Sequence, residues 1–360
     1  MGDSSRGCDY HGGCRPGRQE GSALNARTHQ SQPAPSPGLF QAFDAVRPRL
    51  ALVERFITEQ LDAGPAAVRE AGAYVFEGGG KRIRPAILLL VGRMLGYEGD
   101  RDVRYGGVVE MIHTATLVHD DIIDHATLRR GRATANNRWG NQLTVLLGDW
   151  LYTRSMELAL DVGDVDVMRV LSRATIQMIE GEILGLRLKG RIDVSRDEYL
   201  EISRRKTAEL FAAACSIPAL FAPELSRFRA PLDEFGRNLG TCFQIVDDLL
   251  DLTASQQRLG KPVFSDLREG TLTLPFILLL PRLDRAERAM IEQVMADGTF
   301  KGASPEKLRE LLERHDVLAE VRAVAHEYGR RAVAALDTLP AAPERDLLAA
   351  APSLLIDRDY

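Results

Sequence analysis

Two clusters of aspartates, far apart in the chain, have the spacing that lets carboxylates share a metal ion. They are Asp120, Asp121 and Asp124, and Asp247, Asp248 and Asp251. In each cluster the first and last members are about one helical turn apart, so their carboxylates project from one face of a helix. Mg²⁺ would relieve the repulsion between them, because it prefers carboxylate and phosphate oxygens. A solvated acidic helix end is the alternative for either cluster alone, but the same spacing in both, each after an apolar helix, favours two facing metal-binding clusters.

Basic residues accompany the aspartates in several groups. They are Lys81, Arg82 and Arg84 after the glycines at 78–80, Arg129, Arg130 and Arg132 shortly after the first cluster, Arg204, Arg205 and Lys206 in mid-chain, and Lys261 after the second cluster. The glycine turn is not a Walker loop, since Arg82 follows Lys81 where Ser or Thr is needed. Lysine and arginine still bind phosphate oxygens well. Each group alone could be a solvated surface, but together with the aspartates they predict a site for two polyphosphates.

Helices must position these residues, because apolar side chains recur at helical spacing from Phe40 onward. Helical stretches are predicted near residues 142–161, 165–188, 196–223, 231–253, 271–280, 286–296 and 305–338, and strand-like alternation of any useful length is absent. Residues 1–38 are rich in Gly, Ser, Pro, Gln and Arg, a composition typical of disorder. The sequence therefore predicts a disordered tail at 1–38 and one all-α domain at 39–360.

Composition narrows the class of protein further. The 360 residues carry a net charge of -5, which argues against nucleic-acid binding through bulk positive charge. No apolar run approaches the ~18–20 residues of a membrane span, and the tail lacks a secretory signal. Four cysteines without framework spacing indicate a reduced interior. The spacing of Cys8, His11 and Cys14 could form half of a metal site, but no second half is in view and an inert tail is favoured. We expect a cytoplasmic protein.

The ordered motifs of the chain resemble those of the trans-polyprenyl diphosphate synthases, especially the octaprenyl and heptaprenyl types. The matching segments, within a resemblance from about Phe40 to Pro340, are Gly79–Pro85, Asp120–Asp124 followed by Leu128–Gly131, Lys206–Thr207, Phe243–Asp251 and Leu259–Pro262. The resemblance implies an isoprenoid synthase fold, with antiparallel helices around a deep central cavity, usually as a homodimer. It also implies Mg²⁺, three ions per site, with Mn²⁺ as an alternative.

The resemblance assigns roles to individual residues. Lys81, Arg84, His113 and Arg130 would bind isopentenyl diphosphate, whereas Arg129, Lys206 and Lys261 would hold an allylic diphosphate with Mg²⁺ on Asp120, Asp124 and Asp247. Asp121, Asp248 and Asp251 complete the catalytic clusters, and Thr207 and Gln244 would place oxygen dipoles near the developing cation. Two positions depart from the family, which usually has Lys at Thr271 and Gly at Phe264.

The implied reaction ionises the allylic diphosphate, and the double bond of isopentenyl diphosphate then attacks the cation. The positions about one turn before Asp120 are the small residues Thr116 and Ala115, with Ile112 and Val108 deeper. The family's short-chain members tend to place an aromatic there, so we expect a product longer than C20, in the range C30–C45 and best matched by C40. A transient membrane contact would suit release of such a product.

Three alternatives to this function are a short-chain synthase (C15 or C20), a terpene cyclase and a non-catalytic partner subunit. A cyclase normally has an Asn/Ser/Glu pattern as its second metal motif and needs no site for a second diphosphate. A silent subunit would be expected to have lost aspartates, and this chain keeps both clusters.

Overall fold

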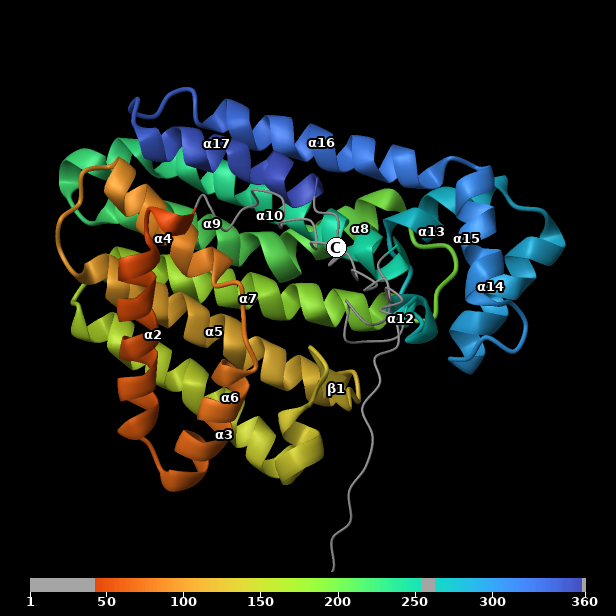
Figure 1. The fold of residues 1–360 in the computed structure, drawn as a ribbon, viewed down its shortest axis with the longest axis horizontal. Helices are drawn as coiled ribbons and strands as arrows, with labels where there is room; N and C mark the ends of the chain where they lie inside the picture. Colours follow the sequence, from red (N-terminus) through yellow and green to blue (C-terminus); the bar gives the residue numbers. More distant parts are fainter. Residues whose placement is uncertain (1–42, 254–262, 358–360) are drawn as a thin grey trace, which may run out of the picture. The chain divides into compact units, whose positions relative to one another are not determined.

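The computed structural model describes residues 43–253 and 263–357, and these residues are almost entirely helical (Figure 1). The helices are α2 (Arg47–Asp62), α3 (Ala66–Glu77), α4 (Ile83–Met94), α5 (Arg101–Ile123), α6 (Ala135–Asp161), α7 (Val165–Leu188), α8 (Arg196–Ser203), α9 (Glu209–Ser216), α10 (Arg229–Thr253), α12 (Ser265–Arg268), α13 (Leu274–Leu279), α14 (Arg285–Asp297), α15 (Pro305–Arg314), α16 (Val317–Ala335) and α17 (Pro343–Ile356). Shorter elements are a π-helical turn (Arg204–Ala208), 3₁₀ turns (Ile217–Leu220, Pro223–Phe228, Leu280–Arg282) and a hairpin of β1 (Leu128–Arg129) and β2 (Arg132–Ala133). The predicted all-α fold is confirmed.

The chain divides into two units, Met1–Ser36 and Pro37–Tyr360, and every described residue belongs to the second. The predicted tail, with its Cys8 and Cys14, lies outside the described residues. Among the helices that are described, none is long and apolar enough to span a bilayer.

Two apolar cores are connected by two long helices. One core is built mainly from α2 to α7, α9 and α17, and the other from the C-terminal part of α10 and from α12 to α16. Helix α10 belongs to both, since Phe235 and Leu239 lie in the first core and Ile245 and Leu249 in the second. Helix α7 likewise runs from the first core to Leu188 in the second. Both helices also carry acidic residues of the site described below.

The predicted helix over 305–338 was wrong in one respect, because it is two helices. α15 ends at Arg314, and Asp316 adopts a left-handed conformation with φ of 52° before α16 begins. Helix α17 and the hairpin were not among the predicted elements. Two-residue strands are too short to show alternation, so the hairpin left no pattern in the sequence.

Candidate active site

The first aspartate cluster closes the C-terminal end of α5, with Asp120 and Asp121 in the last turn and Asp124 just after it. A helix dipole places partial negative charge at this end, so carboxylates there are disfavoured unless a cation is near. Burial raises the pKa of Asp120 to about 6; Lys206 lowers it in part, and Glu182 raises it. The basic groups of the protein therefore do not fully offset the cost of ionising Asp120, and this cluster can accept a further cation.

Two members of this cluster already contact cations of the protein. Asp121 is buried and accepts a hydrogen bond of 2.7 Å from Arg129 Nε, which ties the hairpin to α5. Asp124 is more exposed, and its Oδ1 lies 3.9 Å from Lys189 Nζ. Asp121 thus orients a basic side chain, whereas Asp124 remains accessible to a ligand.

The second cluster lies in the last turns of α10, and its members have different surroundings. Asp248 is buried, and its two oxygens accept hydrogen bonds of 2.6 Å from Tyr199 and 2.7 Å from Gln244. Burial raises the pKa of Asp248 well above its usual value. Asp251 is also buried and accepts hydrogen bonds from the start of α12. Only Asp247 is exposed within this cluster.

The clusters thus divide into three aspartates that are buried and three that keep more exposed surface, although Asp120 is only 19% exposed and both Asp120 and Asp124 lie near lysines. The accessible members are Asp120, Asp124 and Asp247. They are the same three that the sequence predicts as metal ligands, and that role stays a prediction.

Lys206 and Thr207 lie on the π-helical turn Arg204–Ala208, between α8 and α9. The Lys206 ammonium forms an ion pair with Glu182 of α7 and lies 3.7 Å from Asp120 Oδ2. Burial lowers the pKa of Lys206, but the charges of these two carboxylates outweigh burial and raise it overall. The predicted cation is therefore held at the first cluster and stays charged.

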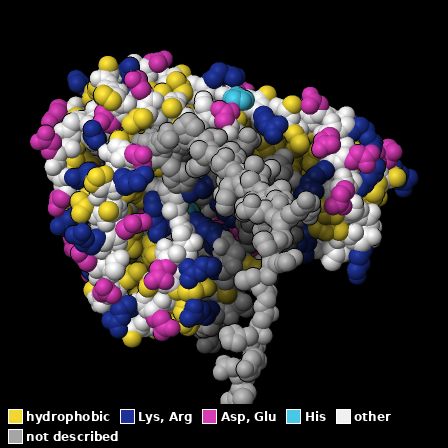
Figure 2. All heavy atoms as spheres, in the orientation of Figure 1, with side chains coloured by type: hydrophobic (Ala, Val, Ile, Leu, Met, Phe, Trp, Pro, Cys, Tyr) yellow, Lys and Arg dark blue, Asp and Glu magenta, His cyan; other side chains and the backbone are white. Residues whose placement is uncertain are grey.

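A chain of hydrogen bonds connects this turn to the second cluster. Thr207 Oγ1 donates to Gln244 Oε1 at 2.6 Å, and Gln244 Nε2 donates to Asp248 Oδ1 at 2.7 Å. The predicted residues Lys206, Thr207 and Gln244 are thus brought together with both clusters. In Figure 2, Lys and Arg side chains line the wall of a hollow near the middle of the visible face.

A second group of basic residues surrounds a cavity of about 60 Å³ between α3, α5 and the hairpin. The Arg, His, Asp and Glu residues that line it are Arg82, Glu110, His113, Asp121, Arg129, Arg130 and Arg132. Arg130 and Gly131 form the hairpin turn with φ of 53° and 73°, which presents Arg130 beside the cavity. Burial and the charges of neighbouring arginines lower the pKa of His113 well below its usual value. The imidazole is therefore neutral near pH 7.

The basic residues around the start of α4 are of two kinds. Arg82 Nη1 donates to Glu110 at 2.9 Å and Nη2 to the Phe76 carbonyl at 3.0 Å, so its contacts are internal. Arg84 is buried with its guanidinium 4.4 Å above the ring of Phe211, and its Nε has no hydrogen-bond partner among the described residues. Burial lowers the pKa of Arg84 to about 10. A buried cation with an unused donor is suited to an anionic ligand. Lys81, three residues earlier in the chain, is half-buried.

Sequence reasoning missed several residues that shape the site. Glu182 pairs with Lys206, Tyr199 holds Asp248, and Glu110 holds Arg82. None belongs to a repeated motif; the two glutamates were visible only as acidic residues within predicted helices, and Tyr199 left no signal. The remaining predicted cation, Lys261, lies outside the described residues.

Phe264 and Thr271, the two positions that depart from the family pattern, have different surroundings. Phe264 adopts a left-handed conformation with φ of 56°, which explains why glycine is usual there. Its ring is fully buried and packs near Phe276 and Phe300. Thr271 is exposed and follows the last turn after α12. The backbone N–H of Phe264 donates to the backbone carbonyl of Asp251 at 3.1 Å, so this residue is bonded directly to the last member of the second cluster.

Comparison with known proteins identifies the family of this chain. Residues 65–313 match the family described as polyprenyl synthetase. The chain belongs to the polyprenyl synthetase family. An octaprenyl diphosphate synthase of Escherichia coli is 37% identical over 86% of this chain and 96% of its own length. A heptaprenyl diphosphate synthase component 2 of Geobacillus stearothermophilus is 36% identical over 86% and 96%. A polyprenyl synthase of Caulobacter crescentus, solved with calcium and isoprenyl diphosphate, is 32% identical, with a TM-score of 0.84 over 91% of this chain and all of its own.

The donor set of this polyprenyl synthetase suits Mg²⁺. Across residues 43–253 and 263–357, no three acidic, His or Cys side chains converge closely enough to hold a metal by themselves. Mg²⁺ does not need such a cage, because it binds through one or two carboxylates, substrate phosphates and water. Both clusters stand at helix C-termini, where the dipole favours a cation. These residues therefore fit an ion that binds together with a diphosphate.

Proposed function

We propose that this polyprenyl synthetase condenses isopentenyl diphosphate with an allylic prenyl diphosphate to give an all-trans polyprenyl diphosphate, in an Mg²⁺-dependent reaction. The observation that carries the proposal is the presence of two anion-binding groups with different chemistry. One combines Asp120 with Lys206, and the other combines His113 and Arg130, which line the arginine-lined cavity, with the buried Arg84, whose charge adds to burial in lowering the pKa of His113. A reaction that releases one diphosphate and retains another needs both. We assign this activity to a domain spanning residues 39–360.

The allylic diphosphate belongs, in this proposal, beside Asp120, Asp124 and Asp247, held by Lys206, Arg129 and Lys261. Mg²⁺ on these aspartates, or Mn²⁺ as an alternative, with three ions per site, would supply the charge that stabilises the leaving diphosphate. The pairing of Lys206 with Asp120 and Glu182 keeps this ammonium protonated for the same purpose.

Thr207 and Gln244 are suited to stabilising the allylic cation. Thr207 Oγ1 donates a hydrogen bond to Gln244 Oε1, so the lone pairs of the threonine oxygen remain available to positive charge. Gln244 is fixed in turn because its amide group donates to Asp248. These oxygens would act as preorganised dipoles, which cost no reorganisation when the cation forms.

The acceptor, isopentenyl diphosphate, belongs beside Arg84, His113, Arg130 and Lys81. Neutral His113 can donate a hydrogen bond to a phosphate oxygen without competing for its charge. The acceptor's double bond forms the new carbon–carbon bond to the allylic carbon, and the proton it loses passes to the departing diphosphate.

We infer a product longer than C20, in the range C30–C45, with C40 as the expected length. Thr116 lies one helical turn before Asp120 on α5, and Ala115, Ile112 and Val108 continue away from the aspartates with no aromatic ring. The octaprenyl and heptaprenyl synthases named above support the same range.

We also propose a cytoplasmic homodimer, with brief membrane contact when the product is released. An apolar stripe is exposed on α7 at the spacing of one helix face, and α6 adds two further residues. The stripe consists of Val145, Leu146, Ile176, Ile179, Ile183 and Leu186. Such a patch on a folded protein usually marks an interface, and an uncharged stripe is complementary to a second copy of itself. Light scattering should report a dimer, with Ile179→Glu dissociating it and Leu52→Glu, on α2, serving as the control. A monomeric parent protein would instead indicate that the stripe binds a different protein. The name of the heptaprenyl relative, which calls it a component, is compatible with that outcome.

A product assay tests the proposed reaction. The purified chain would be incubated with Mg²⁺, labelled isopentenyl diphosphate and farnesyl diphosphate, and the products separated by chromatography after removal of diphosphate. We expect a ladder ending between C30 and C45 that disappears with EDTA. A ladder ending at C15 or C20 would indicate a short-chain synthase, and cyclic hydrocarbon without incorporated label a terpene cyclase. Activity that appears only after a second protein is added, and that survives Asp120→Asn in this chain, would indicate a non-catalytic subunit.

A further inference from the structure

The turn that carries Lys206 and Thr207 has an uncommon backbone. It is a single π-helical turn, Arg204–Ala208, inserted between α8 and α9. Such a turn adds one residue to the helix and so rotates the side chains that follow by about 100°. Regular α-helical geometry would therefore aim the Lys206–Thr207 pair elsewhere. Because π-helical turns are rare, contacts from outside the turn must maintain this one.

Two neighbouring helices approach the turn so closely that only glycine fits. A Cβ atom on Gly181 of α7 would lie 2.7 Å from the backbone nitrogen of Lys206. A Cβ atom on Gly240 of α10 would lie 2.6 Å from Ala208 Cα. The turn is thus enclosed by α7 and α10. Close packing alone, however, does not determine how the side chains on the turn are oriented.

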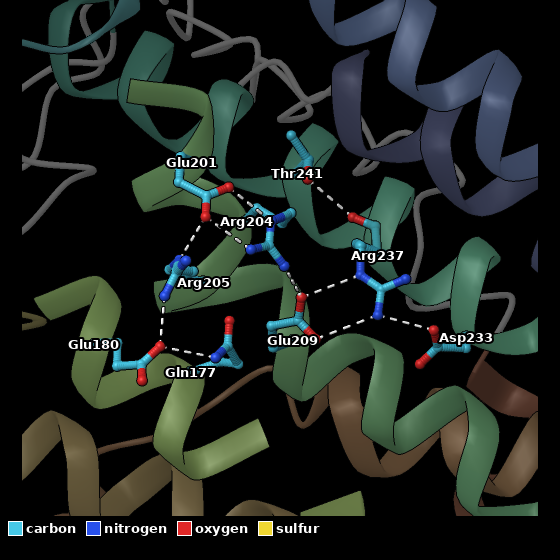
Figure 3. Close-up of polar contacts among 9 residues, drawn as sticks. All are labelled: Gln177, Glu180, Glu201, Arg204, Arg205, Glu209, Asp233, Arg237 and Thr241. Carbon is cyan, nitrogen blue, oxygen red and sulfur yellow. Dashed lines mark hydrogen bonds and ion pairs between the residues drawn. The ribbon is translucent and has the colours of Figure 1, made fainter. Parts of the chain in front are cut away.

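A network of ion pairs fixes the orientation of the turn (Figure 3). Arg205 reaches from the turn to Glu180 of α7 and to Glu201 of α8. Arg204 donates to both carboxylate oxygens of Glu201, each at 2.9 Å, and also pairs with Glu209. The two arginines that precede Lys206 are therefore anchored on three separate helices.

Glu209 is the centre of this network. It is the first residue of α9 and is buried, with a side chain 10% exposed. Its carboxylate lies between Arg204 and Arg237, and the latter donates to its two oxygens at 3.1 and 3.3 Å. Arg237 is fixed on α10 by Asp233 at 2.8 Å. Removing the charge of Glu209 would leave two guanidiniums without their shared anion.

We propose that Glu209 and Arg237 are positioning residues for the allylic diphosphate: through Arg204 they hold the π-helical turn that aims Lys206 and Thr207 at the aspartate clusters. Neither residue contacts Lys206 or lines the arginine cavity among the described contacts. Their influence should therefore be much larger at the allylic site than at the isopentenyl site, although helix α9, which begins at Glu209, also carries Phe211 beneath Arg84. This inference rests on the function proposed above.

The test compares Glu209→Gln with a matched variant, Glu344→Gln. Glu344 is equally buried, with a side chain 9% exposed, and pairs with Arg93 at 2.6 Å, but it joins α17 to α4. We expect Glu209→Gln to lower kcat/KM for the allylic substrate about 10- to 100-fold, the range for a slightly misplaced catalytic group. The KM for isopentenyl diphosphate should stay within about twofold, and Glu209→Asp, which keeps the charge, should recover part of the loss. Glu344→Gln should leave both substrates' constants near those of the parent.

Amide hydrogen exchange provides a readout that does not depend on activity. Exchange of residues 204–208 should accelerate in Glu209→Gln and not in Glu344→Gln. Equal kinetic and exchange behaviour of the two variants would overturn the proposal, as would an equal rise in KM for both substrates. If Glu209→Gln fails to fold, Arg237→Gln takes its place, with a smaller effect in the same direction. A parent protein that makes no product would reject the proposed function, while the exchange result would still decide whether Glu209 holds the turn.

Discussion

Lys206 Nζ lies 3.7 Å from Asp120 Oδ2, and the same ammonium pairs with Glu182. One cation therefore serves two carboxylates that come from α5 and α7. Both are close enough to raise the pKa of Lys206 despite its burial. In the reaction proposed above, Asp120 would be a ligand of Mg²⁺, and Glu182 could then keep the ammonium of Lys206 in place. The two carboxylates would thus have different tasks, one toward the metal and one toward the lysine.

The accessible aspartates should be far more important for turnover than for folding. Asp120→Asn and Asp247→Asn should each lower turnover by at least roughly several hundred-fold, because each removes charge that positions a leaving diphosphate. The melting temperature should not fall, since removing one carboxylate from an acidic helix end relieves repulsion. Steady-state kinetics at saturating Mg²⁺ measures the effect, with the exposed Asp62→Asn as control. Near-normal turnover in either variant would reject the two-cluster assignment.

The pH dependence of stability should reveal the cost of ionising Asp120. Its pKa is about 6 in the fold against 3.8 ordinarily, so above pH 6 the folded protein carries a cost of at most about 3 kcal/mol. That cost is lost as the pH falls toward 4 and the carboxyl is protonated. In EDTA, Asp120→Asn should therefore have a larger free energy of unfolding than the parent at pH 8. The difference between the two proteins should decrease steadily toward pH 4. Denaturant unfolding at several pH values measures this difference. A difference that does not change with pH would contradict the partial burial of the Asp120 carboxylate.

The two diphosphate sites should respond to different basic residues. Arg84→Lys keeps the positive charge but removes the planar fork, which should raise the KM for isopentenyl diphosphate about 10- to 100-fold. Lys261→Ala should act mainly on the allylic substrate. We choose lysine at position 84 because Arg84 is buried over Phe211, and alanine would leave a cavity. Kinetics with each substrate varied in turn would show the opposite pattern if the pockets were assigned the wrong way round.

Phe264 allows two opposing effects to be weighed. Phe264→Gly relieves a left-handed conformation that costs about 1–3 kcal/mol, but it removes a fully buried ring whose loss typically costs about 3–5 kcal/mol. Packing should win, so the variant should be less stable by roughly 1–3 kcal/mol in denaturant unfolding. A more stable variant would mean that backbone strain at this residue outweighs the packing of its ring.

Local spacing was enough to predict the helical class and to locate the two aspartate clusters at helix ends. The roles of the aspartates and of the basic residues came from the family resemblance and stay predictions. The sequence did not predict which aspartates are buried. Asp248 is buried because Tyr199, 49 residues earlier, reaches it, and Lys206 is held because Glu182 lies on a neighbouring helix. Such pairings depend on how helices pack, and helical periodicity does not determine them. The break at Asp316 was missed for a similar reason, since a left-handed aspartate leaves no pattern in apolar spacing.

Product length offers the last prediction, and the structure changes the best position at which to test it. The sequence points to Ala115 and Thr116, and Ala115→Tyr would add a ring at either the tunnel wall or the core. Ala115 is 2% exposed, whereas Thr116 is half-buried and lies one turn before Asp120 on the same helix face. Thr116→Phe should therefore block the growing chain with less damage to packing than Ala115→Tyr, which overpacks the core at a typical cost of about 1–3 kcal/mol. We expect Thr116→Phe to accumulate C15 to C20 products while keeping most of its first-condensation rate, measured by chromatography of labelled products. Leu52→Phe, on the exposed part of α2, is the matched control and should leave the ladder unchanged. If the Thr116→Phe ladder ends where the parent's does, the chain grows along a different helix face.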